Sequence, residues 1–483
     1  MIITIIITMS HNYYYNISSI PIEIISAIIN DYDINIIDQL AFCGTCRTYY
    51  MHIIIYHLDT RYVDSASFIQ SRFSTIKSLR IKNKRAGTPE KNVEYNFSFF
   101  TQLTKLTLIQ TINIENISYL TKLKTLKIEN GNANIIQNEM DTLINLLSLT
   151  IYNNDHIKNL TCLSHLTKLR SPYCIMNING LTNLTYLDIR YCKIYIDISQ
   201  FTNLRTLNIE ACTNINQDNI MNLTQLTSLN INRNKSVNNI AHLSNLTELH
   251  ADYQSAITQN SIDKLFNLKY LYCHSNNKIT NMNHLTNLVY LNTYTYYAMR
   301  SPDIGNVYNL RTLKIPFYES VCDNIKYFTN LTDLDASGYS SEINQDIIQR
   351  LTNLTTLDIH CNKNITNVTH LWQLTKLIIS STEKITSLEN LINLTHLNIS
   401  DVMYITKIDH LTKLTTLNLN DNAIIKNIST VTKLTHLDIC GTSCAIDQDN
   451  INNLYLLRKL PRRYNNKITS TEHLTRLKKK YQI

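Results

Sequence analysis

Apolar residues recur along most of the chain in one fixed frame. The clearest copy runs from Leu411 to Ile424 and reads L-x-x-L-x-x-L-x-L-x-x-N-x-I. A weaker first copy stands at Leu79–Ile81. The frame recurs roughly 19 times from about residue 76 onward, which indicates an internal repeat. Its third leucine, which marks the phase, falls at positions 106, 126, 149, 169, 187, 207, 229, 249, 271, 291, 313, 334, 357, 377, 397, 417, 437 and 460.

The frame predicts one short strand in each repeat. Because strand side chains alternate between two faces, Leu417 and Leu419 should both point inward. Leu411 and Leu414 should fill the interior from the opposite, convex side. A single repeat buries too few apolar side chains to offset its ordering entropy, so we expect the repeats to be stable only when stacked.

This frame resembles that of the leucine-rich repeat family. The resemblance implies an α/β solenoid, a leucine-rich repeat horseshoe with a parallel concave sheet. Asn234, Asn362 and Asn422 stand at the N position, where an amide side chain can hydrogen-bond backbone groups as the chain leaves the strand. Cys192 and Cys212 take the same position, which is a familiar replacement in this family.

Most of the longer repeats carry an insertion that resembles Ile-Asn-Gln-Asp. These insertions occupy residues 215–223, 257–265, 343–351 and 446–454. Asp or Asn just before an apolar run can cap a helical turn. We therefore expect short helices on the convex side at these four places, and only tight or extended crossings in the 20-residue repeats.

Residues 16–60 do not follow the repeat. Apolar residues at helical spacing follow Pro21, which sits where a helix could begin. The opening from Ile20 to Ile25 has an apolar residue, Pro, any residue, Glu and two aliphatics, and Cys43, Cys46, Arg47, Tyr49 and Tyr50 follow. This segment resembles an F-box, with Ile where Leu is usual at the opening and Tyr where Trp is common in the third helix.

The resemblance implies that the segment docks on a Skp-type adaptor of a cullin–RING ubiquitin ligase. The expected contact residues are Ile20, Pro21, Ile24 and Ile25. The alternative is a plain helical cap that covers the open core of the first repeat. Together with a composition that resembles translation of an AT-rich genome, the chain is similar to the F-box/leucine-rich repeat proteins of giant DNA viruses of amoebae, which are mimivirus-like.

These patterns divide the chain into five parts. We expect an apolar extension over 1–15, an all-α F-box-like segment over 16–60, a linker over 61–75, the repeat array over 76–477 and a basic tail over 478–483. The first part lacks a basic start and a small-residue cleavage site, so it is a poor signal peptide. No apolar run reaches the roughly 18 residues that a membrane-spanning helix needs.

The net charge and the cysteine content add little to the functional interpretation. The net charge of +8 over 483 residues is a weak field, and the basic residues near the C-terminus are typical of a solvated end cap rather than of nucleic-acid binding. The 11 cysteines are odd in number and scattered, and several, such as Cys192 and Cys273, fall at core positions. We read them as reduced thiols of an intracellular protein, expected in the host cytoplasm.

Candidate chemistry is sparse. Cys43 and Cys46 have the C-x-x-C spacing of redox and zinc sites, but no second pair is near, which favours a buried helical pair. Histidines recur as His-Leu-Thr/Ser, for example His242 and His284, but mostly skip repeats, so a metal ladder is disfavoured. With no phosphate loop, nucleophile elbow or zinc-protease motif, we expect no enzyme, no cofactor and no metal.

A protein partner is expected on the concave face. Residues beside the inward leucine of each strand face that surface, and tyrosine is enriched at binding hot spots because it combines area with a polar tip. The alternative is that tyrosine, at 30 residues, is simply common in this chain. The predicted partner-binding residues are Tyr186, His250, Asp252, Tyr270, Tyr272, His274, Tyr290 and Tyr294.

Three functions remain open at this stage. The first is a substrate receptor that recruits a target to a ubiquitin ligase. The second is a repeat scaffold or decoy without a ligase link. The third is a surface adhesin, which the cysteines and the absence of a recognisable secretion signal disfavour. No nucleic-acid or membrane partner is expected.

Overall fold

The structure is a computed structural model of the chain. It describes residues 57–59, 77–82, 95–98 and 100–478, apart from 110–113, 130–134, 153, 155, 174–176, 253, 295–298, 301, 316–317, 321–322 and 340. The chain forms two compact units, Met1–Leu223 and Thr224–Ile483. Residues 16–56 of the F-box-like segment, with its four predicted adaptor contacts, lie outside the described residues. The end of that segment, His57–Asp59, was expected to belong to an all-α part but forms a strand that pairs in parallel with Ser78–Arg80 of the first repeat.

The described part of the first unit is built on a parallel sheet with one strand in each repeat. Each strand pairs with the strand of the next repeat, so spatial order follows chain order. A small parallel pair, β3 (Tyr95–Asn96) and β5 (Ile114–Glu115), lies apart from it. The main strands are β1 (His57–Asp59), β2 (Ser78–Lys82), β4 (Lys105–Ile109), β6 (Thr125–Glu129), β7 (Ser148–Ile151), β8 (Lys168–Arg170), β9 (Tyr186–Asp188) and β10 (Thr206–Asn208).

The second unit repeats this arrangement in its described residues. Its sheet is parallel throughout, and β15 (Met299–Arg300) and β17 (Tyr318–Ser320) form a separate parallel pair. The main strands are β11 (Ser228–Asn230), β12 (Glu248–His250), β13 (Tyr270–Tyr272), β14 (Tyr290–Asn292), β16 (Thr312–Lys314), β18 (Asp333–Asp335), β19 (Thr356–Asp358), β20 (Lys376–Ile378), β21 (His396–Asn398), β22 (Thr416–Asn418) and β23 (His436–Asp438).

The predicted phase of the repeat is confirmed. In the register, each phase-marking leucine stands opposite the next, as Leu249 does with Leu271 and Leu271 with Leu291. From Leu106 to Leu437 every marker lies in a strand and is at most 2% exposed, and Leu460, beside a bridge at Lys459, is also buried. The stacked leucines form a continuous apolar core in each unit, which confirms the predicted parallel solenoid.

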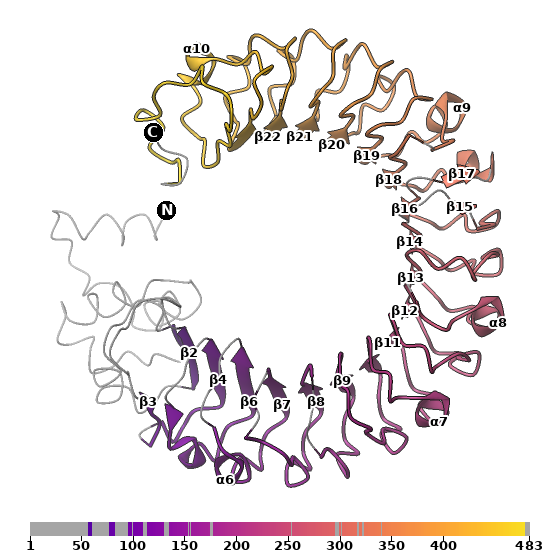
Figure 1. Ribbon diagram of the computed structural model, residues 1–483, viewed down its shortest axis with the longest axis vertical. Coiled ribbons are helices and arrows are strands. Elements are labelled where there is room, and N and C mark those ends of the chain that lie inside the picture. The colour runs from indigo at the N-terminus through magenta and orange to yellow at the C-terminus, as the bar shows by residue number, and fades with distance from the viewer. Residues whose placement is uncertain are drawn as a thin grey trace, which may run out of the picture. The chain divides into compact units, whose positions relative to one another are not determined.

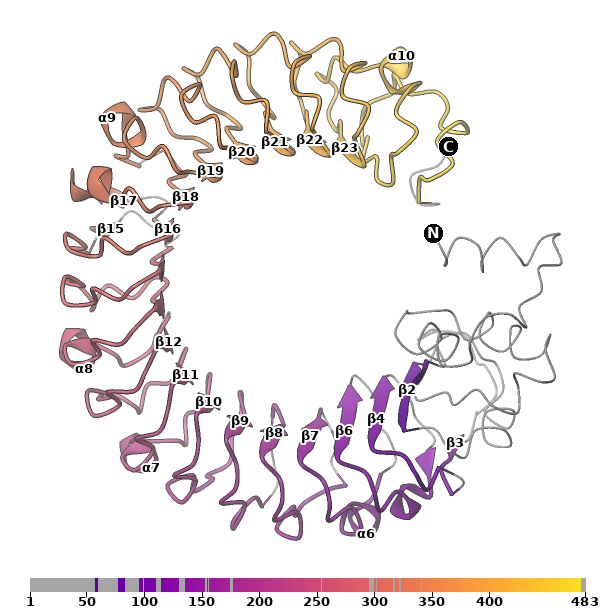
Figure 2. The same ribbon diagram turned by 180° about the vertical axis from the view of Figure 1, so that it is seen from behind.

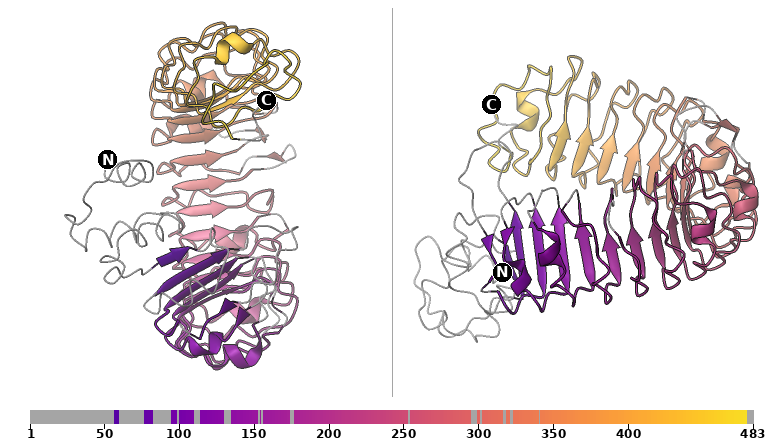
Figure 3. Two further views of the ribbon diagram at one scale, coloured as in Figure 1. Left: turned by 90° about the vertical axis from the view of Figure 1, so that its left-hand side faces the viewer. Right: turned by 60° about the horizontal axis from the view of Figure 1, so that its bottom comes forward.

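Each unit has a sheet on one side and crossings on the other. The strands lie on the inner side of each unit's curve, and the short helices lie on the outer side (Figures 1 and 2). Figure 3 shows the strands of each unit side by side and pointing the same way. We call the surface formed by the outward-facing strand residues the concave face.

The four predicted convex helices are present. They are α7 (Gln217–Ile220), α8 (Gln259–Ile262), α9 (Gln345–Ile348) and α10 (Gln448–Ile451). The side chains of the N-cap residues Asn216, Asn344 and Asp447 accept the backbone N–H of the third helical residue, as capping requires. Three elements on this side were not predicted: α6 (Gln137–Met140) and the 3₁₀ turns η3 (Ile117–Tyr119) and η4 (Asp323–Tyr327).

Glutamine at the first helical position links one repeat to the next. The Oε1 atom of Gln345 accepts the backbone N–H groups of Thr366 and Asn367 at 3.0 and 2.9 Å, and its Nε2 donates to the carbonyl of Asn367 at 3.0 Å. Gln137 and Gln259 make the same three contacts one repeat on, and Gln448 accepts the corresponding pair of N–H groups.

Asparagine and threonine form two ladders beside the strands. An asparagine before the second leucine donates its amide to the preceding repeat, as Asn245 does to the carbonyl of Thr224. The threonine after that leucine donates its hydroxyl in the same way, as Thr247 does to the carbonyl of Thr227 at 3.1 Å. Both ladders therefore join each repeat to the preceding one. The asparagines are Asn145, Asn183, Asn203, Asn245, Asn267, Asn287, Asn309, Asn330, Asn353 and Asn393.

The N position acts as predicted. Asn422 is buried, donates to the carbonyls of Ile399 and Val402, and accepts the N–H groups of Ile424 and Ile425. Cys212, at the same position, directs its thiol to the carbonyls of Ile189 at 3.0 Å and Glu210 at 3.7 Å.

The recurrent histidines have a structural role that the spacing did not reveal. The imidazole Nε2 atoms of His284, His370, His410 and His473 lie 3.0–3.3 Å from backbone carbonyls of the preceding repeat. Each of these carbonyls also accepts the backbone N–H three residues further along its own repeat, so the imidazole is a second partner that comes from the next repeat.

Candidate partner-binding surface

Three adjacent strands of the second unit carry a cluster of aromatic side chains on the concave face. We call His250, Tyr270, Tyr272, His274, Tyr290 and Tyr294 the aromatic row. The His250 and Tyr272 rings stack at 4.0 Å between centroids and 7° between planes. Tyr272 then contacts Tyr290 at 4.7 Å, and Tyr270 contacts Tyr290 at 6.5 Å. A second pair, His274 and Tyr294, lies at 5.1 Å.

The solenoid itself brings these rings together. His250 stands opposite Tyr272 in the register, and Tyr270 stands opposite Tyr290. Neighbouring strands lie about 4.8 Å apart, which is close to the spacing of stacked rings. Inward residues such as Leu271 fix the backbone, so the rings are held in place by strand pairing and by one another.

The row keeps an accessible edge. The Tyr270 side chain is 43% exposed, and His250, Tyr272, His274, Tyr290 and Tyr294 are half-buried. Buried ring area with exposed polar tips is the arrangement that protein interfaces use at hot spots. All seven of the predicted partner residues from 250 to 294 therefore lie on one continuous surface.

Two carboxylates accompany the row. Glu248 lies 3.0 Å from the Nε2 atom of His250 and accepts the hydroxyl of Ser228. Asp252 accepts the backbone N–H of His274 and the Asn232 amide, and its own N–H donates to Asn232. Burial raises the pKa of the half-buried Asp252 carboxyl, opposed by the His274 hydrogen bond.

The surroundings of Tyr272 change the pKa of its phenol. Burial raises the pKa of its phenol, and the neighbouring Tyr290 and Glu248 raise it further. The phenol therefore stays neutral at physiological pH and offers a hydroxyl next to negative charge.

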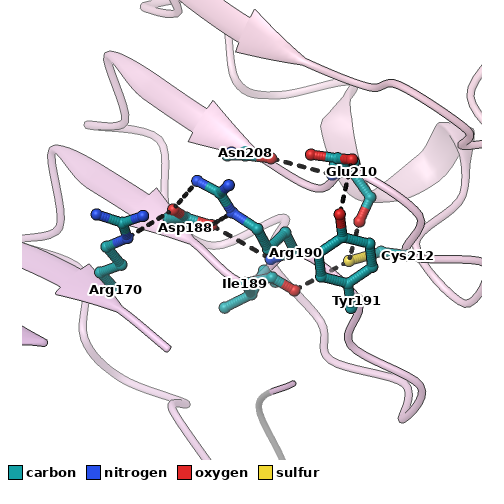
Figure 4. A network of polar contacts seen from close by, with 8 residues as sticks. All are labelled: Arg170, Asp188, Ile189, Arg190, Tyr191, Asn208, Glu210 and Cys212. Carbon is teal, nitrogen blue, oxygen red and sulfur yellow. Dashed lines mark hydrogen bonds and ion pairs between the residues drawn. The ribbon is translucent and has the colours of Figure 1, made fainter. Parts of the chain in front are cut away.

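Tyr186, the remaining predicted residue, belongs to the first unit and adjoins a different cluster. The Asp188 carboxylate on β9 is completely buried, although it stands on the concave face. The Nε and Nη2 atoms of Arg190 donate to this carboxylate at 3.0 and 2.7 Å, and the Nε atom of Arg170 on β8 lies 3.1 Å from its Oδ2. Figure 4 shows the two guanidinium groups on either side of Asp188.

This ion cluster extends along the strands. The Tyr191 hydroxyl donates to Glu210 at 3.0 Å (Figure 4), and the Tyr191 ring stacks on Tyr173 at 5.2 Å. The Asp188 hydrogen bond raises the pKa of Arg190, while burial raises that of Tyr186. Arg170 was not among the predicted residues, because its partner lies on the next strand and 18 positions away in sequence.

The described residues hold little else that suggests chemistry. In them, no group of three or more His, Cys, Asp or Glu side chains is placed to hold a metal ion. Burial raises the pKa of the Cys273 thiol, and burial with an Asp141 hydrogen bond raises that of Cys162 to about 11, so neither is a thiolate at neutral pH. No helix of the described chain has the length and apolar character required to span a membrane.

Comparisons with known proteins find likeness only among solved structures. No protein-family model and no curated protein matches the sequence. A functional domain of internalin J from Listeria monocytogenes is 24% identical over 58% of this chain and 58% of that domain, with a TM-score of 0.37. Another Listeria internalin is 22% identical over 73% of this chain and 84% of its own, with a TM-score of 0.33. A leucine-rich repeat protein of Leptospira interrogans is 19% identical over 82% and 98%, with a TM-score of 0.42.

Proposed function

We propose that the chain is a protein-interaction module whose second unit holds a protein partner on the aromatic row. The observation that carries this proposal is the continuous contact from His250 through Tyr272 to Tyr290, with an exposed edge at Tyr270. Rings that are already ordered lose little entropy when a partner covers them.

Paired substitutions on and off the row test the proposal. Tyr272→Ala with Tyr290→Ala removes the centre of the row, and Tyr455→Ala, at a 57% exposed tyrosine outside the row, is the matched control. Loss of a hot spot of about 2 kcal/mol weakens binding roughly 30-fold. A host-cell protein captured by the wild type should be kept by the control and lost by the double variant. Capture that survives in the double variant would count against the row.

The finer proposal is that the chain is a substrate receptor of a Skp/cullin/F-box ubiquitin ligase. Its support is the F-box resemblance of residues 16–60, with Ile20, Pro21, Ile24 and Ile25 as adaptor contacts and the repeats as the target-binding part. This role places the protein in the host cytoplasm, where the ligase acts.

Co-purification with a Skp-type adaptor tests the ligase link. The adaptor should accompany the wild type and be lost with Pro21→Ala and Ile24→Ala, while capture of the partner through the row is unchanged. If no adaptor binds the wild type, the ligase role falls, and a scaffold or decoy without a ligase link is the function that stands.

A further inference from the structure

The concave face around the aromatic row is acidic although the chain is basic. In the six concave strands β12, β13, β14, β16, β18 and β19, the described strand residues and those two positions beyond each strand carry five carboxylates and one lysine. With histidine neutral, this is a formal charge of −4 against +8 for the whole chain. The carboxylates are Glu248, Asp252, Asp333, Asp335 and Asp358, and the lysine is Lys314.

The carboxylates of β18 and β19 reinforce one another. Asp335 and Asp358 stand opposite each other in the register, a like-charge pair on adjacent strands. Burial raises the pKa of Asp335, and Asp358 raises it further. Lys314 stands opposite Asp335 on the other side, and the Nδ1 atom of His360 lies 2.8 Å from the Asp358 carboxylate, so one lysine and one histidine accompany the two carboxylates. The Ser337 hydroxyl donates to Asp335 at 2.7 Å but brings no charge.

The aromatic row suits a cationic side chain. Aromatic ring faces attract ammonium and guanidinium groups, and the methylene stems of Lys and Arg pack on ring edges. Within β11 to β14, no described concave position holds Lys or Arg. Thr312 stands opposite Tyr290 on β16, and its short side chain ends the row of rings on that side.

The distances between the two features suit an extended chain. Two strand spacings separate β14 from β18, which is about 10 Å. Three residues of extended peptide cover roughly the same distance. One basic side chain on Tyr290 and a second three residues along the partner therefore reach the rings and Asp333 or Asp335 together.

We propose that the partner segment held by the second unit is a basic, extended peptide that crosses the strands from the aromatic row to the carboxylates of β18 and β19. This inference rests on the proposed interaction function and adds the chemistry of the partner. Its arginines or lysines contact Tyr290 and the carboxylates Asp335 and Asp358.

Binding of a defined peptide tests this inference. The probe is fluorescein-labelled hexa-arginine, titrated with the full chain at low salt and followed by anisotropy, with hexaglutamate as the opposite-charge probe. Hexa-arginine should bind and hexaglutamate should not. Because the attraction is electrostatic, raising NaCl from 50 to 500 mM should weaken binding at least about tenfold.

Variants locate the bound peptide. Asp335→Asn keeps the backbone cap, which an asparagine provides natively at Asn398, and should weaken hexa-arginine binding about fivefold. Lys314→Gln removes the opposing charge and should strengthen binding. Tyr290→Ala should weaken it, whereas Asp409→Asn, which neutralises an exposed carboxylate outside the concave strands, should not change it.

The outcomes separate this inference from the proposed function. Equal binding of both peptides, no effect of Asp335→Asn, or weaker binding with Lys314→Gln would overturn the basic-partner inference. If a host protein is still captured through Tyr272 and Tyr290 while hexa-arginine does not bind, the interaction function stands and only the partner chemistry is wrong. Failure of both experiments rejects both.

Discussion

The glutamine link between repeats offers the sharpest test of how this solenoid is held together. Gln345→Ala removes the two backbone N–H bonds, the bond to the Asn367 carbonyl and a 3.2 Å bond from the Thr366 hydroxyl. Four bonds at about 1 kcal/mol each are offset by about 2 kcal/mol for immobilising the glutamine side chain. We therefore expect the substitution to lower the free energy of unfolding by about 2 kcal/mol.

Hydrogen exchange gives the direct readout, because stability in a repeat array depends on neighbouring interfaces. Amide protection at Thr366 and Asn367 should fall in Gln345→Ala and persist in Gln345→Glu, which keeps an oxygen for the two N–H groups. Gln349→Ala, at an exposed glutamine at the end of the same helix, is the matched control. Unchanged protection at Thr366 and Asn367 in Gln345→Ala would refute the reasoning, as would an equal loss in the control.

Three further outcomes can be measured on the same chain. Gly441→Ala should lower the free energy of unfolding by about 1–3 kcal/mol, seen as a lower Tm, because φ is +103° and a Cβ would collide with the Asp421 carboxylate. Ala211→Gly should raise stability by up to about 1 kcal/mol in urea unfolding, since alanine there holds φ at 56°; a fall would contradict this. The Asp358 hydrogen bond raises the pKa of His360. The pair's contribution to the free energy of unfolding is therefore complete below the unfolded pKa of roughly 6.5 and is lost as pH rises through the folded pKa. An NMR titration of His360 should give a lower pKa in Asp358→Asn than in the wild type.

The core of the fold was predictable because its signal is local and repeated. Leu417 and Leu419 lie two residues apart and both are buried, as strand alternation requires. The convex helices that begin at Gln217 and Gln345 follow from a capping residue before an apolar run. The helix at Gln137 was missed because Ile136, which has no capping side chain, precedes it.

Contacts between repeats were not predictable from one repeat at a time. The partners of Gln345 lie 21 and 22 residues away, and that of His370 lies 22 residues away. The spacing of the histidines could therefore weigh against a metal ladder, but it could not reveal this contact. The strand rule placed Tyr272 and Tyr290 on the concave face, but the contact of their rings depends on a one-to-one register that only the structure shows.

The concave face accepts either of two residue types at one recurrent strand position. The third residue of a concave strand, which is the second of its two outward-facing residues, accepts the backbone N–H two residues further on. An asparagine does this as well as an aspartate, as Asn292 and Asn398 show. Aspartate at this position, in Asp188, Asp335 and Asp358, therefore adds charge without adding a cap. Arg170 and Arg190 neutralise the first of these, whereas the other two face each other across adjacent strands. Within the chain, Lys314 stands opposite Asp335 and His360 bonds to Asp358, so each carboxylate has one cationic neighbour. A like-charge pair that the fold does not need is unfavourable, so a bound basic side chain would add to this stabilisation, and that makes β18 and β19 the place to look for one.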